Sequence, residues 1–343
     1  MPDRPYGLVV KGDEEAVRQA YACFERQPVD QEVSDPDDRP PARVTTLGGS
    51  VAVTGPGTFF GGVQRTLHFE PSTEPGWQFE RTDLPDCFPI DVTVKNVWPV
   101  PIVRNAVSSI VLLSGSPHNY MRMVEHIISL RVGLGLDNVR IRMDSGDPPL
   151  FDRGSLDLVE AVQKAGLVGQ SAAPTYVTVR KPVTIGGAGG SFLTILPAQG
   201  GSPDLTVDCA IDFKTAIGKQ RVRFTVGPKI FTYASQARTN TPLWKVYFTK
   251  TVGKLFADTR NLGYTRENVS IAGAYRYLNP PRLLHNGKAL EAAWHRSTLD
   301  LLAAVALIDK GRLAGTLLSY KSGHNLDVDL VRQIYKRDLL VRL

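Results

Sequence analysis

The apolar positions of the chain follow a strand period first and a helix period afterwards. Between residues 44 and 115, short runs rich in β-branched residues alternate with turn residues, which is typical of strands. Near-helical spacing of apolar residues then predicts helices at 119–132 and from about Ser155 to Gly166, on either side of a strand at 137–146. Strands followed by helices that pack on them form one α+β unit.

The same order of elements occurs a second time. Strand-like runs fill residues 175–226, and helical patterns follow at 288–309 and 326–342, with one more strand at 315–324 between them. The sequence therefore predicts an α+β protein of two similar halves, split near residues 169–174.

The N-terminal region differs from these halves. Residues 13–27 predict one helix with Asp13 as its N-cap, and its apolar side contains Ala16, Ala20, Cys23 and Phe24. Residues 28–41 combine five acidic residues with four prolines, which is typical of a solvated linker. We therefore expect 1–42 to be a helical appendage and an acidic, Pro-rich linker.

The amino-acid composition argues against several classes of protein. The 343 residues contain 40 Lys and Arg against 34 Asp and Glu, and a net charge of +6 is too small and dispersed for a nucleic-acid footprint. The cysteines, Cys23, Cys87 and Cys209, are far apart, which favours a reducing cytoplasm over a disulfide framework. Because no stretch approaches about 18 apolar residues and no secretory signal begins the chain, we expect it not to cross a membrane.

Candidate chemistry begins with Glu125 and His126, adjacent residues on an otherwise apolar predicted helix. A histidine beside a glutamate can provide a metal ligand and a base for water, although alone the pair is more simply a surface or capping pair. His295, Asp300 and His324 add imidazole and carboxylate groups from two further regions. Zinc favours this set of ligand types.

Eight short motifs also occur in a fixed order along the chain. They are GPGTFFGG (55–62), FERTDL (79–84), VEHIISLRVGLGLDN (124–138), PLFDRGS (149–155), ARTN (237–240), YRYLNP (275–280), HRSTLDLL (295–302) and YKSGH (320–324). In this order and spacing, from about residue 45 to 340, the chain resembles the zinc-dependent UDP-3-O-acyl-N-acetylglucosamine deacetylases of lipid A biosynthesis.

The resemblance implies a fold and a reaction. It implies two sheet-plus-helices sandwich domains, 43–170 and 171–343, that face each other across the active-site cleft. The expected reaction is removal of acetate from an acylated sugar nucleotide by zinc-bound water in the cytoplasm. Because the substrate carries an acyl chain, a peripheral contact with membrane lipid is also possible. The sequence does not predict the oligomeric state.

The resemblance also implies roles for individual residues. Glu125 matches the family's general base, and His324 matches the general acid that protonates the leaving amine. Thr239 matches the hydroxyl that stabilises the oxyanion. His126, His295 and Asp300 match the three zinc ligands.

One spacing departs from the family. Its histidine and aspartate ligands are four residues apart on one helix, whereas His295 and Asp300 are five apart, about 140° around a regular helix. A one-residue π-bulge would bring His295 back to the metal. Alternatively, Arg296 takes the ligand position and pairs with Asp300 in place of a metal. Ala304 also stands where the family has a carboxylate that orients the general acid, so His324 would lack that partner.

The substrate side is expected near two groups of residues. The segment 241–262 follows ARTN where the family inserts an element that forms the acyl-chain tunnel, and Trp244, Phe248 and Phe256 recur there at helical spacing. By periodicity alone an ordinary core helix is an equal interpretation. Three cations near the motifs are candidates for the diphosphate, namely Arg238, Arg296 and Lys321.

Two other functions stay open. A metal-free relative would bind a lipid-like or nucleotide ligand without catalysis. A zinc hydrolase with a different N-acyl substrate is the third hypothesis, because Phe59 replaces a family histidine and Asn240 a family phenylalanine.

Overall fold

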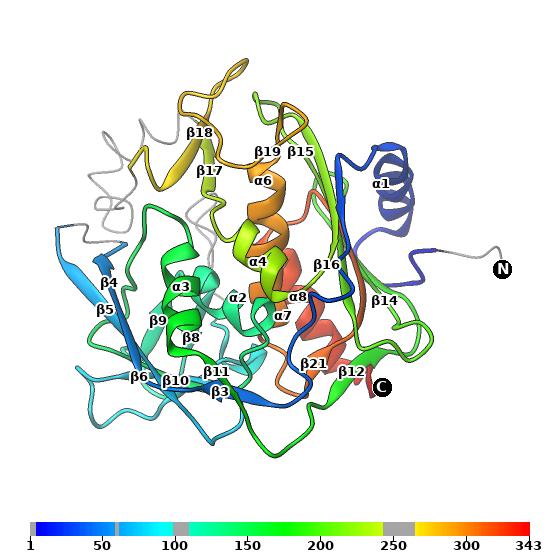
Figure 1. Ribbon diagram of the computed structural model, residues 1–343. Coiled ribbons are helices and arrows are strands. Elements are labelled where there is room, and N and C mark those ends of the chain that lie inside the picture. The colour runs from blue at the N-terminus through cyan, green and yellow to red at the C-terminus, as the bar shows by residue number, and fades with distance from the viewer. Residues whose placement is uncertain (1–4, 59–61, 99–109, 243–264) are drawn as a thin grey trace.

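Two β-sheets face each other across a layer of helices (Figure 1). The computed structural model describes residues 5–58, 62–98, 110–242 and 265–343. Helices α2 (Glu125–Gly133) and α3 (Leu156–Ala165) lie on the side of the first sheet, and α8 (His324–Lys336) packs on the second. The structure is thus α+β, which confirms the predicted fold class.

The first sheet has five strands in the order β4-β5-β10-β6-β7. Its central strand β10 pairs antiparallel with β5 and parallel with β6, so that Ile141 lies between Phe69 and Phe79, and all three side chains are buried. The strand bounds are β4 Val51–Pro56, β5 Gln64–Pro71, β6 Trp77–Arg81, β7 Ile90–Asp91 and β10 Val139–Met143.

The second sheet has seven strands in the order β1-β13-β14-β22-β15-β16-β2. Its strands are β1 Leu8–Lys11, β2 Gln31–Val33, β13 Val183–Gly187, β14 Ser191–Leu196, β15 Leu205–Asp212, β16 Lys219–Thr225 and β22 Gly315–Tyr320. A continuous helical segment crosses its inner face as α6 (Glu291–Trp294), the π-helix η3 (His295–Asp300) and α7 (Leu301–Val305). Helix α7 contacts α2, so the two sheet layers meet through these helices.

The N-terminal residues wrap the second sheet. The predicted helix is confirmed as α1 (Glu14–Arg26), with the Asp13 side chain accepting from the Ala16 backbone N–H at 2.7 Å. Strands β1 and β2 form opposite edges of the sheet, and α1 covers its outer face (Figure 1).

The acidic segment after α1 is also packed, unlike the solvated linker that its composition predicts. Strand β2 pairs in parallel with β16. Asp38 is buried, because its carboxylate accepts from the backbone N–H groups of Lys229 and Ile230 at the first turn of α4 (Pro228–Ala234). A carboxylate at a helix N-terminus satisfies free N–H groups and interacts favourably with the helix dipole.

Three predicted helices have different bounds in the structure, and the one expected at 288–309 runs only from Glu291 to Val305. The helix expected from residue 119 begins only at Glu125, because Tyr120–Arg122 form strand β9 against β8 (Val111–Leu113). The helix expected to residue 342 ends at Lys336, and Leu340–Arg342 form β23, which pairs with β12 (Tyr176–Val179). At 120–122 and 340–342, pairing with another strand competes with the local helical periodicity.

The remaining elements are short. They are β3 Thr45–Leu47, η1 Val94–Asn96, β11 Leu167–Gly169, β17 Thr239–Pro242, β18 Val269–Ala272, β19 Leu284–His285, β20 Lys288–Ala289 and β21 Arg312–Leu313. Across the described ranges, none of the helices has the length and apolarity that a membrane span requires.

The packing of α1 gives a stability prediction. The Phe24 side chain is fully buried, its ring centroid lies 5.6 Å from that of Phe192, and the Arg221 guanidinium stacks 3.8 Å from its centroid. We expect Phe24→Ala to lower the free energy of unfolding by about 3–5 kcal/mol through lost burial and a cavity. Urea denaturation measures this, with the exposed Leu8→Ala as control, expected within about 0.5 kcal/mol of the parent. An equal effect of both substitutions would contradict the packing role of α1.

Candidate active site

A cavity of about 380 Å³ opens where α2, η3, β17 and the loop before α8 meet. The six predicted catalytic and metal-binding residues line it, namely Glu125, His126, Thr239, His295, Asp300 and His324, and so do two of the predicted phosphate-binding residues, Arg296 and Lys321. The predicted convergence of Glu125, His126, Thr239 and His324 on one cavity is therefore confirmed. A larger cavity of about 620 Å³ elsewhere in the fold is lined by none of these six.

The five-residue spacing between His295 and Asp300 is accommodated by a widened helical turn. Residues His295–Asp300 are π-helical, and the Leu301 N–H donates to the Arg296 carbonyl five residues earlier. The hydroxyls of Ser297 and Thr298 both donate to the carbonyl of Trp294, at 3.2 and 2.5 Å, and so satisfy an acceptor at the start of this turn. The predicted bulge is confirmed, and it places His295 and Asp300 on the same side of the helix.

Two imidazoles and a hydroxyl meet at one point of the cavity. The Nε2 atoms of His126 and His295 are 3.0 Å apart, and the Thr239 hydroxyl lies 3.1 Å from the His295 Nε2 and 3.5 Å from the His126 Nε2. Burial, reinforced by the neighbouring His295, lowers the pKa of His126 to about 3. His126 is therefore a neutral imidazole at physiological pH.

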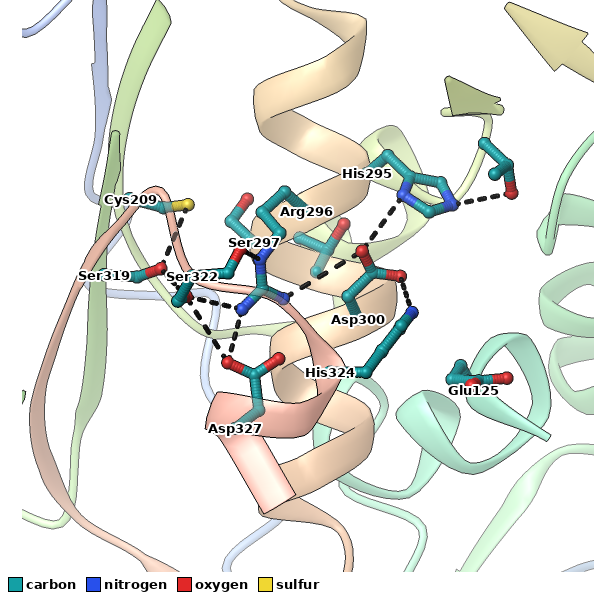
Figure 2. Close-up of polar contacts among 12 residues, drawn as sticks. Glu125, Cys209, His295, Arg296, Ser297, Asp300, Ser319, Ser322, His324 and Asp327 are labelled. Carbon is teal, nitrogen blue, oxygen red and sulfur yellow. Dashed lines mark hydrogen bonds and ion pairs between the residues drawn. The ribbon is translucent and has the colours of Figure 1, made fainter. Parts of the chain in front are cut away.

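Asp300 lies between two histidines (Figure 2). Its Oδ2 is 3.5 Å from the His295 Nδ1, and its Oδ1 is 3.4 Å from the His324 Nε2. Burial alone would raise the pKa of Asp300, but the charges of His295, His324 and Arg296 outweigh it and hold this pKa well below its usual range. Asp300 is therefore ionised, and its two oxygens lie close to a nitrogen of each ring.

Glu125 and His324 complete the titratable groups. Burial raises the pKa of Glu125, opposed in part by His324, and its Oε1 accepts the backbone N–H of Ile110. Burial lowers the pKa of His324, but the carboxylates of Asp300 and Glu125 outweigh burial, so that the pKa is raised. The cavity thus holds a carboxyl and an imidazole whose pKa values are both shifted upward, which is typical of acid and base groups.

The donor atoms suit zinc in kind. Neutral imidazoles and an ionised carboxylate are ligands that zinc favours, and the Nε2 atoms of His126 and His295 converge. The Asp300 carboxylate, however, faces the other ring nitrogen of His295. Within the described ranges, no group of three His, Cys, Asp or Glu side chains is arranged to hold a metal ion.

The predicted phosphate-binding cations have different positions. Arg238 is buried and donates from its backbone, Nε and Nη2 to Glu291, and from Nη2 to the Pro280 carbonyl. Lys321 lines the cavity, is exposed, and donates to the Gly189 carbonyl at 3.1 Å. Trp244, Phe248 and Phe256, expected to line an acyl tunnel, lie outside the described residues, as does Phe59.

Arg296 points away from the imidazole pair, into a buried polar cluster. Its Nε donates to the Ser322 carbonyl at 2.9 Å, and its Nη2 donates to the Ser322 hydroxyl at 2.7 Å and to Asp327 (Figure 2). The alternative in which Arg296 replaces a metal ligand rests on its contact with Asp300, which is long, at 3.9 Å.

Two parts of this region were not expected from the sequence. Asp327, the buried partner of Arg296, follows His324 by three residues, and its only signal is an acidic residue in a first helical turn. The second part is an apolar wall of the cavity, formed by Leu150, Phe151, Leu158 and Phe213. Leu150 and Phe151 belong to the motif at 149–155, to which the sequence assigns no role.

An α+β fold with a carboxyl group, convergent imidazoles and a hydroxyl around one cavity has the groups of a hydrolase that acts through an activated water. Residues 44–336 match the family of UDP-3-O-acyl N-acetylglycosamine deacetylases, and the chain belongs to this family.

Individual relatives agree with this assignment. A UDP-3-O-acyl-N-acetylglucosamine deacetylase of Marinobacter nauticus is 27% identical over 297 residues, covering 85% of this chain and 90% of that protein. The proteins of the same name from Thermosynechococcus vestitus and Nostoc sp. are 29% and 28% identical. They match 84% of this chain and cover 93% and 97% of their own lengths. The first 43 residues lie outside the family match.

The neutral state of His126 can be tested directly. In the metal-free protein we expect the His126 ring signals, assigned with His126→Gln, to stay unchanged between about pH 5 and 8, because the pKa is near 3. Side-chain NMR of 13C-labelled histidines measures this. Titration of the His126 signal near the ordinary value of 6.5 would contradict the burial of this imidazole.

Proposed function

We propose that this chain is a zinc-dependent deacetylase that removes acetate from a UDP-3-O-acyl-N-acetylglucosamine in lipid A biosynthesis. The observation that carries the proposal is the convergence of Glu125, His126, Thr239, His295, Asp300 and His324 on one cavity. The family membership supports the substrate class. We place the reaction in the cytoplasm, in keeping with the dispersed free cysteines. We also propose that the two sheet layers are two similar domains and that the reaction takes place between them.

The chain's own groups perform the proton transfers in this proposal. Glu125 accepts a proton from the attacking water, whose oxygen forms a bond to the amide carbon. The Thr239 hydroxyl donates a hydrogen bond to the oxyanion that develops on the carbonyl oxygen. His324 donates a proton to the amine nitrogen as the C–N bond breaks, so that acetate and the free amine leave.

The proposed metal ligands are His126, His295 and Asp300. Bound there, zinc supplies Lewis-acid polarisation of the amide carbonyl and lowers the pKa of water. The neutral state of His126 and the ionised state of Asp300 support this ligand set.

One observation favours a second candidate, the metal-free relative that binds a ligand without catalysis. Asp300 contacts the far nitrogen of His295 and the His324 ring, whereas the imidazole Nε2 atoms contact each other. In that case Asp300 is a structural acceptor for both histidines. Metal content separates the two candidates.

The acid and base assignments predict a bell-shaped pH profile of kcat/KM. Activity requires ionised Glu125 and protonated His324, so it falls as pH drops through the pKa of Glu125 and as pH rises through that of His324. Since both pKa values are raised, we expect the acidic limb above the ordinary carboxyl value of 4.5 and the basic limb above 6.5. Acetate release from the acylated sugar nucleotide measures the profile.

Substitutions of Glu125 and His324 test which residue is responsible for each limb of the pH profile. We expect Glu125→Gln and His324→Gln each to lower kcat by roughly 100-fold or more, because each removes one proton transfer. The residual activity of Glu125→Gln should lose the acidic limb, and that of His324→Gln the basic limb. Unchanged limbs in both variants would contradict the assignments.

Zinc binding gives a separate test. The purified chain is expected to bind about one zinc ion, and His295→Ala to weaken zinc affinity by at least 10-fold, since it removes one of three ligands. Metal titration and elemental analysis measure this, with His285→Ala, a half-buried histidine outside the cavity, as a control that leaves affinity unchanged. A parent chain that stays zinc-free after loading would favour the metal-free relative.

A further inference from the structure

The Arg296 side chain lies in a polar cluster at one wall of the candidate cavity, which both Arg296 and Ser322 line. Its guanidinium bonds the carbonyl and hydroxyl of Ser322 and pairs with Asp327, while the side chains of Arg296 and Asp327 are 8% and 0% exposed. The Ser322 hydroxyl also bonds that of Ser319 at 2.7 Å (Figure 2). With Nε and Nη2 both occupied, only Nη1 is left for a substrate phosphate, and this atom is buried 3.9 Å from the Asp300 carboxylate.

The cluster adjoins the segment that carries His324. Ser322 lies two residues before His324, and Asp327 lies in the first turn of α8, which begins at His324. Lys321, just before this segment, has a φ of +52°, a left-handed conformation that costs about 1–2 kcal/mol for a residue with a side chain. Contacts on both sides of the turn must therefore hold it in place.

The ring of His324 has few direct restraints. Its Nε2 lies 3.4 Å from Asp300, and its buried Nδ1 has no hydrogen-bond partner among the residues that the structure describes. Ala304, in α7, has no polar group to orient the ring. The position of His324 thus depends on the backbone on which it stands, and Arg296 fixes that backbone.

We propose that Arg296 and Asp327 form a positioning pair for His324, a role that rests on His324 being the general acid of the proposed function. The guanidinium joins the turn at Ser322 and the first turn of α8 to the π-helix that carries His295 and Asp300. One buried ion pair therefore sets the distance between the acid and the imidazole pair. Arg296 and Asp327 act through His324 and are not themselves catalytic residues.

The widened turn accounts for the direction of Arg296. In the π-helix, His295 and Asp300 lie together beside the imidazoles of the cavity, and Arg296 reaches the Ser322 turn. The guanidinium then stands between two carboxylates, with Nη1 at 3.9 Å from Asp300 and Nη2 bonded to Asp327. A lysine has no planar fork for simultaneous bonds to Ser322 and Asp327.

The test uses the full-length chain loaded with zinc and four variants, Arg296→Met, Asp327→Asn, the double variant with both changes, and Arg296→Lys. The control is Arg221→Met, which breaks a comparable buried pair with Asp208, whose side chains are 9% and 6% exposed, under helix α1. We measure kcat and KM with UDP-3-O-acyl-N-acetylglucosamine, together with zinc content and thermal unfolding.

The expected result is a loss in kcat alone. Arg296→Met and Asp327→Asn should each lower kcat by roughly 10- to 100-fold through misplacement of the acid, with KM within about twofold. The double variant, which leaves no unpaired buried charge, should lose no more than the worse single variant, because both act through one pair. Arg296→Lys should recover part of the loss, and Arg221→Met should keep its kcat even where its unfolding temperature falls.

Other results would overturn the positioning role. A rise in KM with unchanged kcat would make Arg296 a substrate contact, and an equal loss of kcat in Arg221→Met would reduce the effect to general stability. A histidine NMR spectrum decides the matter even if the parent chain shows no deacetylation, which would count against the proposed function alone. The His324 ring signal should broaden or split in Arg296→Met and stay sharp in Arg221→Met, and an unchanged signal in Arg296→Met would refute the pair.

Discussion

The widened turn at residues 295–300 is the constraint on which the cavity depends. In a regular helix His295 and Asp300 would diverge by about 140°, and only one of them would face α2. The π-turn brings both to the same side, where His295 meets His126 and Asp300 meets His324. The turn changes the backbone hydrogen bonds of the helix, and the hydroxyls of Ser297 and Thr298 offset this change because both donate to the Trp294 carbonyl. Both residues belong to the turn.

Burial of several ionisable groups at one place follows from this geometry. An isolated buried charge is unfavourable by several kcal/mol, so each charged group needs a partner of opposite sign. Asp300 provides it for His324, and Asp327 provides it for Arg296. His126 needs no partner of opposite charge, because its lowered pKa keeps the imidazole neutral. The charged groups on η3 and α8 therefore depend on one another, and the removal of one group leaves its partner buried without an opposite charge.

The sequence predicts the cavity better than its surroundings. The resemblance to the family implies that Glu125, His126, Thr239 and His324 meet. The bulge could be predicted from helix geometry, because two ligands five residues apart diverge on a regular helix. The burial of Arg238 could not be predicted, since its partner Glu291 lies 53 residues away and only the tertiary fold brings them together. The start of α2 differs from prediction for a local reason, because β9 pairs with the nearby strand β8 although the apolar period continues from β9 into α2.

The N-terminal residues show how a segment outside the family match contributes to the same architecture. Strand β1 lies at the sheet edge beside β13, and Lys11 reaches Asp329 on α8 at 2.5 Å, while Arg337 at the end of that helix donates to the Val10 carbonyl. The ion pair is partly exposed and contributes little energy by itself. Its position matters more, because α8 begins at His324. The helix is thus held at its first turn by Arg296, along its exposed side by Lys11 and at its end by Val10, and this fixes one wall of the cavity from three directions.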